Sequence, residues 1–223
     1  MKIAIIVQAR FSSKRLPGKV LLKINNRTIL EHVYFNLKKI NNINSIIIAT
    51  SKSKSDDLIN ALCKRKKIEV FRGNLNDVYK RLTSAAKYYG ADYIVRVSAD
   101  SPLINYKIIE DAINNIDLSK YDIITNVLPR TFPKGQSFEI INTRLLENNY
   151  NKIKNKSDKE HVTTFFYRNY KKFKIFNILN KNKDLSKYNF CVDTKDDLAR
   201  IMFIMKKIKN LSLDNLIKNY EDL

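Results

Sequence analysis

Cysteine is scarce in this sequence of 223 residues, and its two cysteines, Cys63 and Cys191, lie far apart in no metal-ligand spacing. We interpret them as reduced, largely buried thiols of a cytosolic protein. The first residues lack the basic start and long apolar core of a signal peptide, and no apolar run approaches membrane-spanning length. We therefore expect a cytoplasmic protein with no membrane partner.

Acidic residues are outnumbered by basic ones, 22 to 42, which gives a formal net charge of +20. Such a charge favours an anionic partner, and nucleic acid, acidic lipid and nucleotide are all candidates. The lysines are scattered with asparagine along the whole length, however, and no concentrated basic stripe with interleaved aromatic residues occurs. Grooves that bind nucleic-acid strands carry such stripes, so we expect no nucleic-acid partner.

Internal repeats and low-complexity linkers are also lacking, which favours one domain over residues 1–223, with residues 129–185 as a smaller lobe beside the sheet. Short β-branched runs alternate with helical patterns, which predicts right-handed βαβ units and a mostly parallel sheet with helices on both faces. The predicted strands are 3–7, 45–50, 68–71, 92–98, 121–125, 137–141, 173–179 and 188–192. The predicted helices are 29–40, 54–66, 76–89, 106–116, 143–150, 159–170 and one beginning near Thr194.

The most informative stretch is residues 8–19, a loop that leaves the first predicted strand. Open α/β sheets bind ligands at the carboxyl ends of their strands. Arginine offers paired donors to phosphate oxygens and lysine adds a compact charge, so the loop predicts a polyphosphate site, although a solvated basic loop would have a similar composition. With one glycine, the stretch is neither a Walker loop nor a dinucleotide fingerprint. Its cationic and hydroxyl side chains belong to Arg10, Ser12, Ser13, Lys14, Arg15 and Lys19.

Two aspartates directly follow predicted strands. Asp100 stands just before Pro102, which lacks a backbone donor and ends the strand. Asp193 ends a later apolar run and precedes a helix entry at Thr194. Both aspartates belong at the rim that carries residues 8–19, where a carboxylate facing a triphosphate would bind Mg²⁺. Taken alone, each is also explained as a turn or N-cap residue.

Several motifs occur in a fixed order along the chain. They are Gln8 to Leu21, Val70-Phe71-Arg72-Gly73 with Asp77-Val78, Asp100-Ser101-Pro102-Leu103, Asn126 to Pro133, Lys159-Glu160-His161-Val162-Thr163, and Val192-Asp193-Thr194 to Leu198. In this order they resemble the acylneuraminate cytidylyltransferase-like nucleotidyltransferases, and most closely the spore-coat polysaccharide biosynthesis cytidylyltransferase branch. The resemblance runs from about residue 3 to 205.

The resemblance implies an α/β, Rossmann-like nucleotidyltransferase fold with a mostly parallel central sheet, helices on both faces and a small substrate and dimerisation lobe. It implies that a sugar oxygen attacks the α-phosphorus of CTP, which releases pyrophosphate and gives a CMP-sugar. Mg²⁺ would bridge phosphate oxygens and offset the charge that builds up during displacement. The protein's contribution would be positioning and electrostatics.

The resemblance also implies roles for individual residues. The nucleotide would be bound by Gln8, Ala9, Arg10, Ser13, Arg15 and Lys19, with Arg72 and Ser98 near the nucleoside. The catalytic residues would be Arg10, Arg15, Lys19 and Asp100, and the Mg²⁺ ligands Asp100 and Asp193. The sugar acceptor would be bound by Gln136, Glu139 and His161.

The sequence departs from the family pattern in two places. Ala99 stands where a glycine usually precedes the aspartate, and Ser101 where a cysteine often follows it, so we expect a slightly reshaped base pocket. The branch usually shows an acidic strand of the type Leu-Asp-Val-Glu after Gly135, and here the sequence runs from Gln136 to Glu139 with one acid lost. We expect this lobe to set the sugar choice, and the family resemblance implies that it forms a homodimer.

Two other functions remain open at this stage. One keeps the fold and changes the substrates, as in a sugar-1-phosphate nucleotidyltransferase that uses another NTP. The other is a nucleic-acid or nucleotide-binding protein whose function depends on its basic charge. Salt dependence separates the two, because a nucleic-acid binder loses affinity steeply as counterions are released.

Overall fold

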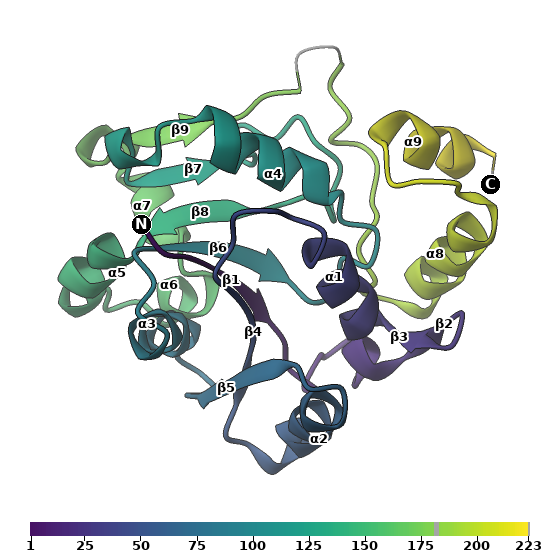
Figure 1. The fold of residues 1–223 in the computed structure, drawn as a ribbon, viewed down its shortest axis with the longest axis horizontal. Coiled ribbons are helices and arrows are strands. Elements are labelled where there is room, and N and C mark those ends of the chain that lie inside the picture. Colours follow the sequence, from purple (N-terminus) through teal and green to yellow (C-terminus); the bar gives the residue numbers. More distant parts are fainter. Residues whose placement is uncertain (181–182, 223) are drawn as a thin grey trace.

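A seven-stranded sheet forms the centre of the computed structural model, which describes residues 1–180 and 183–222 (Figure 1). The strand order is β5-β4-β1-β6-β8-β7-β9, and a separate hairpin pairs β2 with β3. Only β8 runs antiparallel to its neighbours among these seven strands. The strands are β1 (Ile3–Gln8), β2 (Lys23–Ile24), β3 (Arg27–Thr28), β4 (Ser45–Ser51), β5 (Glu69–Gly73), β6 (Tyr93–Ser98), β7 (Ile123–Thr125), β8 (Glu139–Asn142) and β9 (Ile175–Asn177).

Helices cover both faces of the sheet, which confirms the predicted fold class. The helices are α1 (Ile29–Leu37), α2 (Asp57–Arg65), α3 (Val78–Tyr88), α4 (Tyr106–Asn115), α5 (Thr143–Asn149), α6 (Lys156–His161), α7 (Thr164–Arg168), α8 (Lys195–Lys207) and α9 (Leu213–Glu221). Side chains of α1, α2 and α4 pack on one face, and those of α3, α5 and α7 on the other. No helix within the described ranges is long and apolar enough to cross a membrane.

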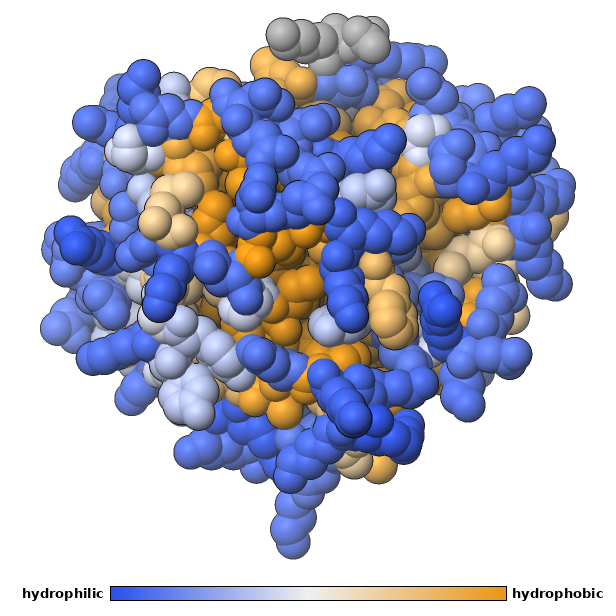
Figure 2. All heavy atoms as spheres, in the orientation of Figure 1, coloured by the Kyte–Doolittle hydropathy of each residue, from blue (hydrophilic) through white to orange (hydrophobic). Residues whose placement is uncertain are grey.

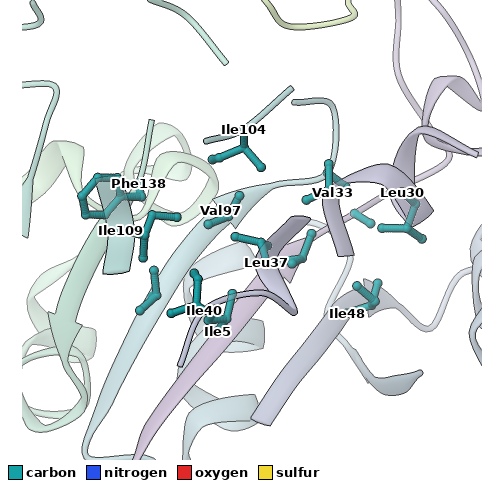
Figure 3. Packing of buried hydrophobic residues seen from close by; sticks show 14 of the residues in the cluster. Ile5, Leu30, Val33, Leu37, Ile40, Ile48, Val97, Ile104, Ile109 and Phe138 are labelled. Atoms are coloured by element: carbon teal, nitrogen blue, oxygen red, sulfur yellow. The ribbon is translucent and has the colours of Figure 1, made fainter. Parts of the chain in front are cut away.

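The two faces follow from the alternation of side chains along each strand. Ile5 of β1 joins the cluster under α1 and α4, whereas Ile6 joins the cluster under α3. Figure 3 shows Ile5 beside Leu37 of α1 in the first cluster. Hydrophilic side chains cover most of the surface seen in Figure 2, and apolar residues show between them.

A capping box starts α1. The Thr28 side chain accepts a hydrogen bond from the backbone of Glu31, and Glu31 accepts one from the backbone of Thr28 at 2.8 Å. Glu31 is buried and also pairs with Lys66 at 2.8 Å. Burial raises the pKa of Glu31, but the hydrogen bonds from Lys66 and Thr28 outweigh it and lower the pKa from 4.5 to about 2.

We expect Glu31→Gln to lower the free energy of unfolding at neutral pH by about 1 kcal/mol, the usual contribution of a helix cap. Since the folded-state pKa of Glu31 lies below its unfolded value, the stabilisation is complete above about pH 4.5 and is lost as the pH falls towards about 2. Urea unfolding at several pH values tests this. The difference between wild type and variant should shrink over that range; a constant difference would contradict the assignment.

Two predicted elements differ from the structure. Residues 188–192 form no regular strand, because Phe190 and Val192 pack against α8 and α9 rather than lying within the sheet. Their backbone bonds go to loops, with Phe190 N donating to Lys134 O and Val192 N to Asp100 O. The predicted helix at 159–170 is divided into α6 and α7 at Val162, whose φ is positive.

Candidate active site

Hydrogen bonds inside the loop after β1, and one to a neighbouring segment, fix the shape of this loop. Phe11 O accepts hydrogen bonds from Ser13 N and Gly18 N, both at 2.8 Å, and Asp56 accepts one from Phe11 N at 2.7 Å. Gly18 has φ of +70°, and a Cβ there would lie 2.8 Å from the Phe11 ring. The closed loop therefore requires glycine at this position.

The register of β1 and β6 brings the two predicted site segments to one edge. Gln8 pairs with Ser98, the last residues of the two strands, and Ala99 N donates to Gln8 O at 3.1 Å. The residues that follow each strand therefore leave from the same carboxyl-end rim. A cavity of about 720 Å³ opens there. Ten predicted site residues line it: Gln8, Ala9, Arg10, Ser13, Arg15, Lys19, Ser98, Asp100, His161 and Asp193.

Asp100 and Asp193, 93 residues apart in sequence, share one lysine. Lys19 Nζ lies 2.6 Å from Asp100 Oδ2 and 2.7 Å from Asp193 Oδ1, and Arg15 Nη2 lies 2.8 Å from Asp193 Oδ2. The backbone bond from Val192 N to Asp100 O, 2.9 Å long, keeps the two segments side by side. Burial lowers the pKa of Lys19, but the charges and hydrogen bonds of the two aspartates outweigh it and raise that pKa above 10.5.

The paired aspartates have the donor chemistry for a hard divalent cation. Their carboxylates already converge on one positive charge, and both side chains keep partial access to solvent, at 19% for Asp100 and 31% for Asp193. Within the described part of the chain, no three His, Cys, Asp or Glu residues gather into a complete metal site. Magnesium typically takes one or two protein carboxylates and completes its shell with phosphate oxygens and water, which these two residues fit.

Arg10 connects the loop after β1 to the opposite wall of the cavity. Its Nη2 lies 2.8 Å from Glu160 Oε1, and both side chains are 44% exposed. Glu160 and His161 end α6, and both line the cavity. The cavity is therefore bounded by the loop after β1 on one side and by the end of α6 on the other.

Arg81, which was not among the predicted site residues, also lines the cavity. It is 2% exposed; its Nη1 donates to Asn74 O at 2.6 Å, and its Nε has no partner among the described residues. Burial lowers the pKa of Arg81 to about 10. A signal was present, because Arg81 lies on the same face of its helix as Val78 and Leu82, where an apolar residue is expected.

Three predicted site residues lie outside this cavity. Arg72 lines a neighbouring hollow of about 610 Å³, donates to Ser51 O and Ser53 O, and pairs with Asp57 at 2.7 Å. That hollow shares Leu75 and Arg81 with the main cavity.

Gln136 and Glu139, which the resemblance implies as acceptor-binding residues, are buried and do not line the cavity. Gln136 is 1% exposed, accepts from Asn105 N and donates to Leu103 O, both at 2.8 Å. Glu139 is 6% exposed and pairs with Arg96 at 3.0 Å. The family resemblance implied functional side chains here, but in the structure both residues are buried and bond to internal partners.

The two departures beside Asp100 are accommodated locally. Ala99 is buried, lines the cavity and is not among the positive-φ residues, so its backbone does not require glycine. Ser101 is 4% exposed and donates to Asp100 Oδ1 at 3.2 Å. Its hydroxyl lies 3.7 Å from Cys191 Sγ, so the turn also contacts the segment that carries Asp193.

An open sheet with one antiparallel strand, a cationic first βα loop and paired rim aspartates define a protein of the α/β nucleotidyltransferase fold. The chain belongs to the family described as Cytidylyltransferase, whose model matches residues 4–222. The expectation of a cytidylyltransferase is thereby confirmed at the level of the family, and the acylneuraminate-like branch stays a prediction.

The chain is also similar to individual proteins. The chain is 38% identical over 176 residues to an uncharacterized protein of Methanocaldococcus jannaschii, covering 79% of this chain and 71% of that protein. It is 27% identical over 214 residues to the spore coat polysaccharide biosynthesis protein SpsF of Bacillus subtilis, covering 92% and 87%. A solved cytidylyltransferase from Leptospira borgpetersenii matches with a TM-score of 0.94 at 32% identity, covering 100% of this chain and 94% of that chain.

Proposed function

We propose that this protein is a Mg²⁺-dependent cytidylyltransferase. It transfers CMP from CTP to an acidic or modified sugar destined for a surface polysaccharide and releases pyrophosphate. The observation that carries the proposal is the position of Lys19, which holds Asp100 and Asp193 together beside a cationic loop. Family membership supports the nucleotide, and the similarity to a polysaccharide biosynthesis protein supports the acceptor class.

In this proposal, the first loop binds the triphosphate. Arg10 and Arg15 offer paired donors to phosphate oxygens, Lys19 adds a compact charge, and the Ser13 hydroxyl adds a hydrogen bond. Asp100 and Asp193 would hold Mg²⁺, which when bound neutralises phosphate charge and polarises the α-phosphoryl group. The acceptor oxygen forms a bond to the α-phosphorus as the bond to the pyrophosphate oxygen breaks.

The nucleoside of CTP and the sugar acceptor bind in different parts of the cavity. The nucleoside end of CTP lies between Ser98 of the main cavity and the adjoining hollow, which has Arg72 at its wall and shares Arg81 with the main cavity. The acceptor lies towards the end of α6, where His161 is exposed and lines the cavity. Binding both substrates across one rim converts a bimolecular step into an oriented one.

We expect pyrophosphate release that requires CTP, Mg²⁺ and an acceptor together. A coupled pyrophosphate assay with the four NTPs against 3-deoxy-nonulosonates, 3-deoxy-octulosonate and simple sugar phosphates tests this. Omitting the acceptor or adding EDTA provides the controls. Turnover with another NTP and a sugar phosphate would instead support the sugar-phosphate nucleotidyltransferase, and release that is indifferent to the nucleotide would contradict both.

A nucleic-acid-binding function predicts a different result in the same preparation. Binding of a fluorescent DNA or RNA oligonucleotide would then weaken steeply between low and physiological salt, because bound phosphates release counterions. We expect only weak binding with no competition by CTP. Tight binding that CTP does not displace, without any turnover, would overturn the enzyme proposal.

A further inference from the structure

The junction between α6 and α7 contains a strained turn. Val162 has φ of +59° and ψ of −58°, and Thr163 N donates to His161 O at 2.6 Å across it. This is the rare γ-turn with positive φ, whose ideal angles are about +75° and −65°. A β-branched residue seldom adopts it. The turn buries Val162 completely and leaves His161 exposed at the cavity.

A strained turn persists only where its surroundings fix it, and here a buried carboxylate does so. Thr163 Oγ1 donates to Glu139 Oε1 at 3.1 Å, directly after the strained residue. Thr163 and Glu139 are 3% and 6% exposed. On the other side of the junction, Asp158 accepts hydrogen bonds from Thr164 and Arg168.

The same carboxylate oxygen is connected to the opposite wall of the cavity. Arg96 Nη1 lies 3.0 Å from Glu139 Oε1, and Arg96 Nε donates to Gln8 Oε1 at 2.9 Å. Tyr167 OH donates to the same Glu139 oxygen at 3.3 Å. Three donors thus converge on one oxygen, and the chain of bonds runs from Gln8, which lines the cavity, to the turn that presents His161.

We propose that Glu139 is a positioning residue that holds the Val162 turn through Thr163 and so fixes His161 at the acceptor end of the cavity. The inference rests on the proposed function only in identifying the ligand beside His161 as the acceptor. The link between Glu139 and His161 does not depend on that function. It explains why an acid follows Gly135 although its side chain does not reach the cavity. Charge-assisted hydrogen bonds of this kind are the stronger ones, and Arg96 pairs with the same carboxylate at 3.0 Å.

The histidine signals allow this link to be measured without turnover. The chain contains two histidines, His161 and His32, and His32 bonds to Ile24 O of β2, so His161→Gln assigns both imidazole resonances in one NMR spectrum. We expect Thr163→Val to shift or split the His161 signal and leave the His32 signal in place. Thr163→Ser keeps the hydroxyl and should restore the wild-type spectrum, and Glu139→Gln should act as Thr163→Val does.

Glu31→Gln is the matched control, because Glu31 is also a buried, ion-paired glutamate, but it lies next to His32. It should shift the His32 signal and leave the His161 signal unchanged. If Glu139→Gln does not fold, Thr163→Val alone decides, since it removes the hydroxyl at nearly constant shape and keeps the Arg96 ion pair. An unmoved His161 signal in folded Thr163→Val overturns the inference.

Kinetics provide the second measurement. A hydrogen bond to a charged group contributes about 1.5–3 kcal/mol, so we expect Thr163→Val to raise the acceptor KM about tenfold or more. The KM for CTP should change less than about twofold, because the lost hydrogen bond lies at the acceptor end of the cavity. If the His161 signal moves but the wild type transfers no nucleotide to any acceptor, the positioning inference is supported and the proposed function fails.

Discussion

Asp100→Asn should lower turnover by at least roughly a hundredfold, the scale on which a preorganised transition-state contact is lost. Asp100 lies 2.6 Å from Lys19 at the end of β6, where its charge faces the proposed triphosphate site. An amide keeps the size of the side chain but removes the charge that would hold Mg²⁺ and neutralise Lys19. Pyrophosphate release at saturating CTP and acceptor, measured over a range of Mg²⁺ concentrations, tests this.

Asp111→Asn is the matched control, because Asp111 is an exposed aspartate on α4. Its turnover should equal that of the wild type. Turnover by Asp100→Asn that stays intact with the correct acceptor would show that the metal assignment is wrong. A loss that excess Mg²⁺ partly restores would support the carboxylate as a ligand.

Lys19→Met should produce a loss of turnover at least as large, together with a change in stability. Lys19 is 8% exposed and is the shared partner of both rim aspartates. Methionine keeps the length of the side chain but leaves two carboxylates facing each other. We expect the free energy of unfolding to fall by about 2 kcal/mol, less than for fully buried pairs because both carboxylates keep some access to water.

The decisive measurement is urea unfolding with and without Mg²⁺. A divalent cation can replace the missing ammonium between Asp100 and Asp193, so Mg²⁺ should stabilise Lys19→Met more than wild type. Lys120→Met, at an exposed lysine with 71% of its side chain accessible, should show neither effect. Equal Mg²⁺ effects in wild type and Lys19→Met would contradict a shared cation position.

The sequence predicted the rim of the site better than its walls. Gln8, Asp100 and the loop between Gln8 and Lys19 follow apolar runs, and the carboxyl ends of parallel strands meet at one edge. Their approach therefore follows from topology alone. Asp193 lies at the same rim for a different reason. Its segment does not join the sheet but bonds to Asp100 O through Val192 N.

The walls were harder to predict because burial depends on contacts between distant segments. Residues 188–192 alternate as a strand does, but they bury their apolar side against α8 and α9. Gln136 and Glu139 look like site residues in sequence, and the fold directs both inward. Arg81 looked like one cation among many, and it is among the largest fully buried side chains described.

The amino-acid sequence by itself determined the family, the alternation of strands and helices, and the group of polar residues at the carboxyl-end rim, because these depend on local pattern and on the direction of each strand. Only the tertiary structure decided that Lys19 joins both aspartates, that Glu139 bonds to Thr163 beside a strained turn, and that Arg81 lines the cavity. The reason is physical: a side chain's charge is written in the sequence, but its partner, its distance and its access to water are set by segments that meet only on folding.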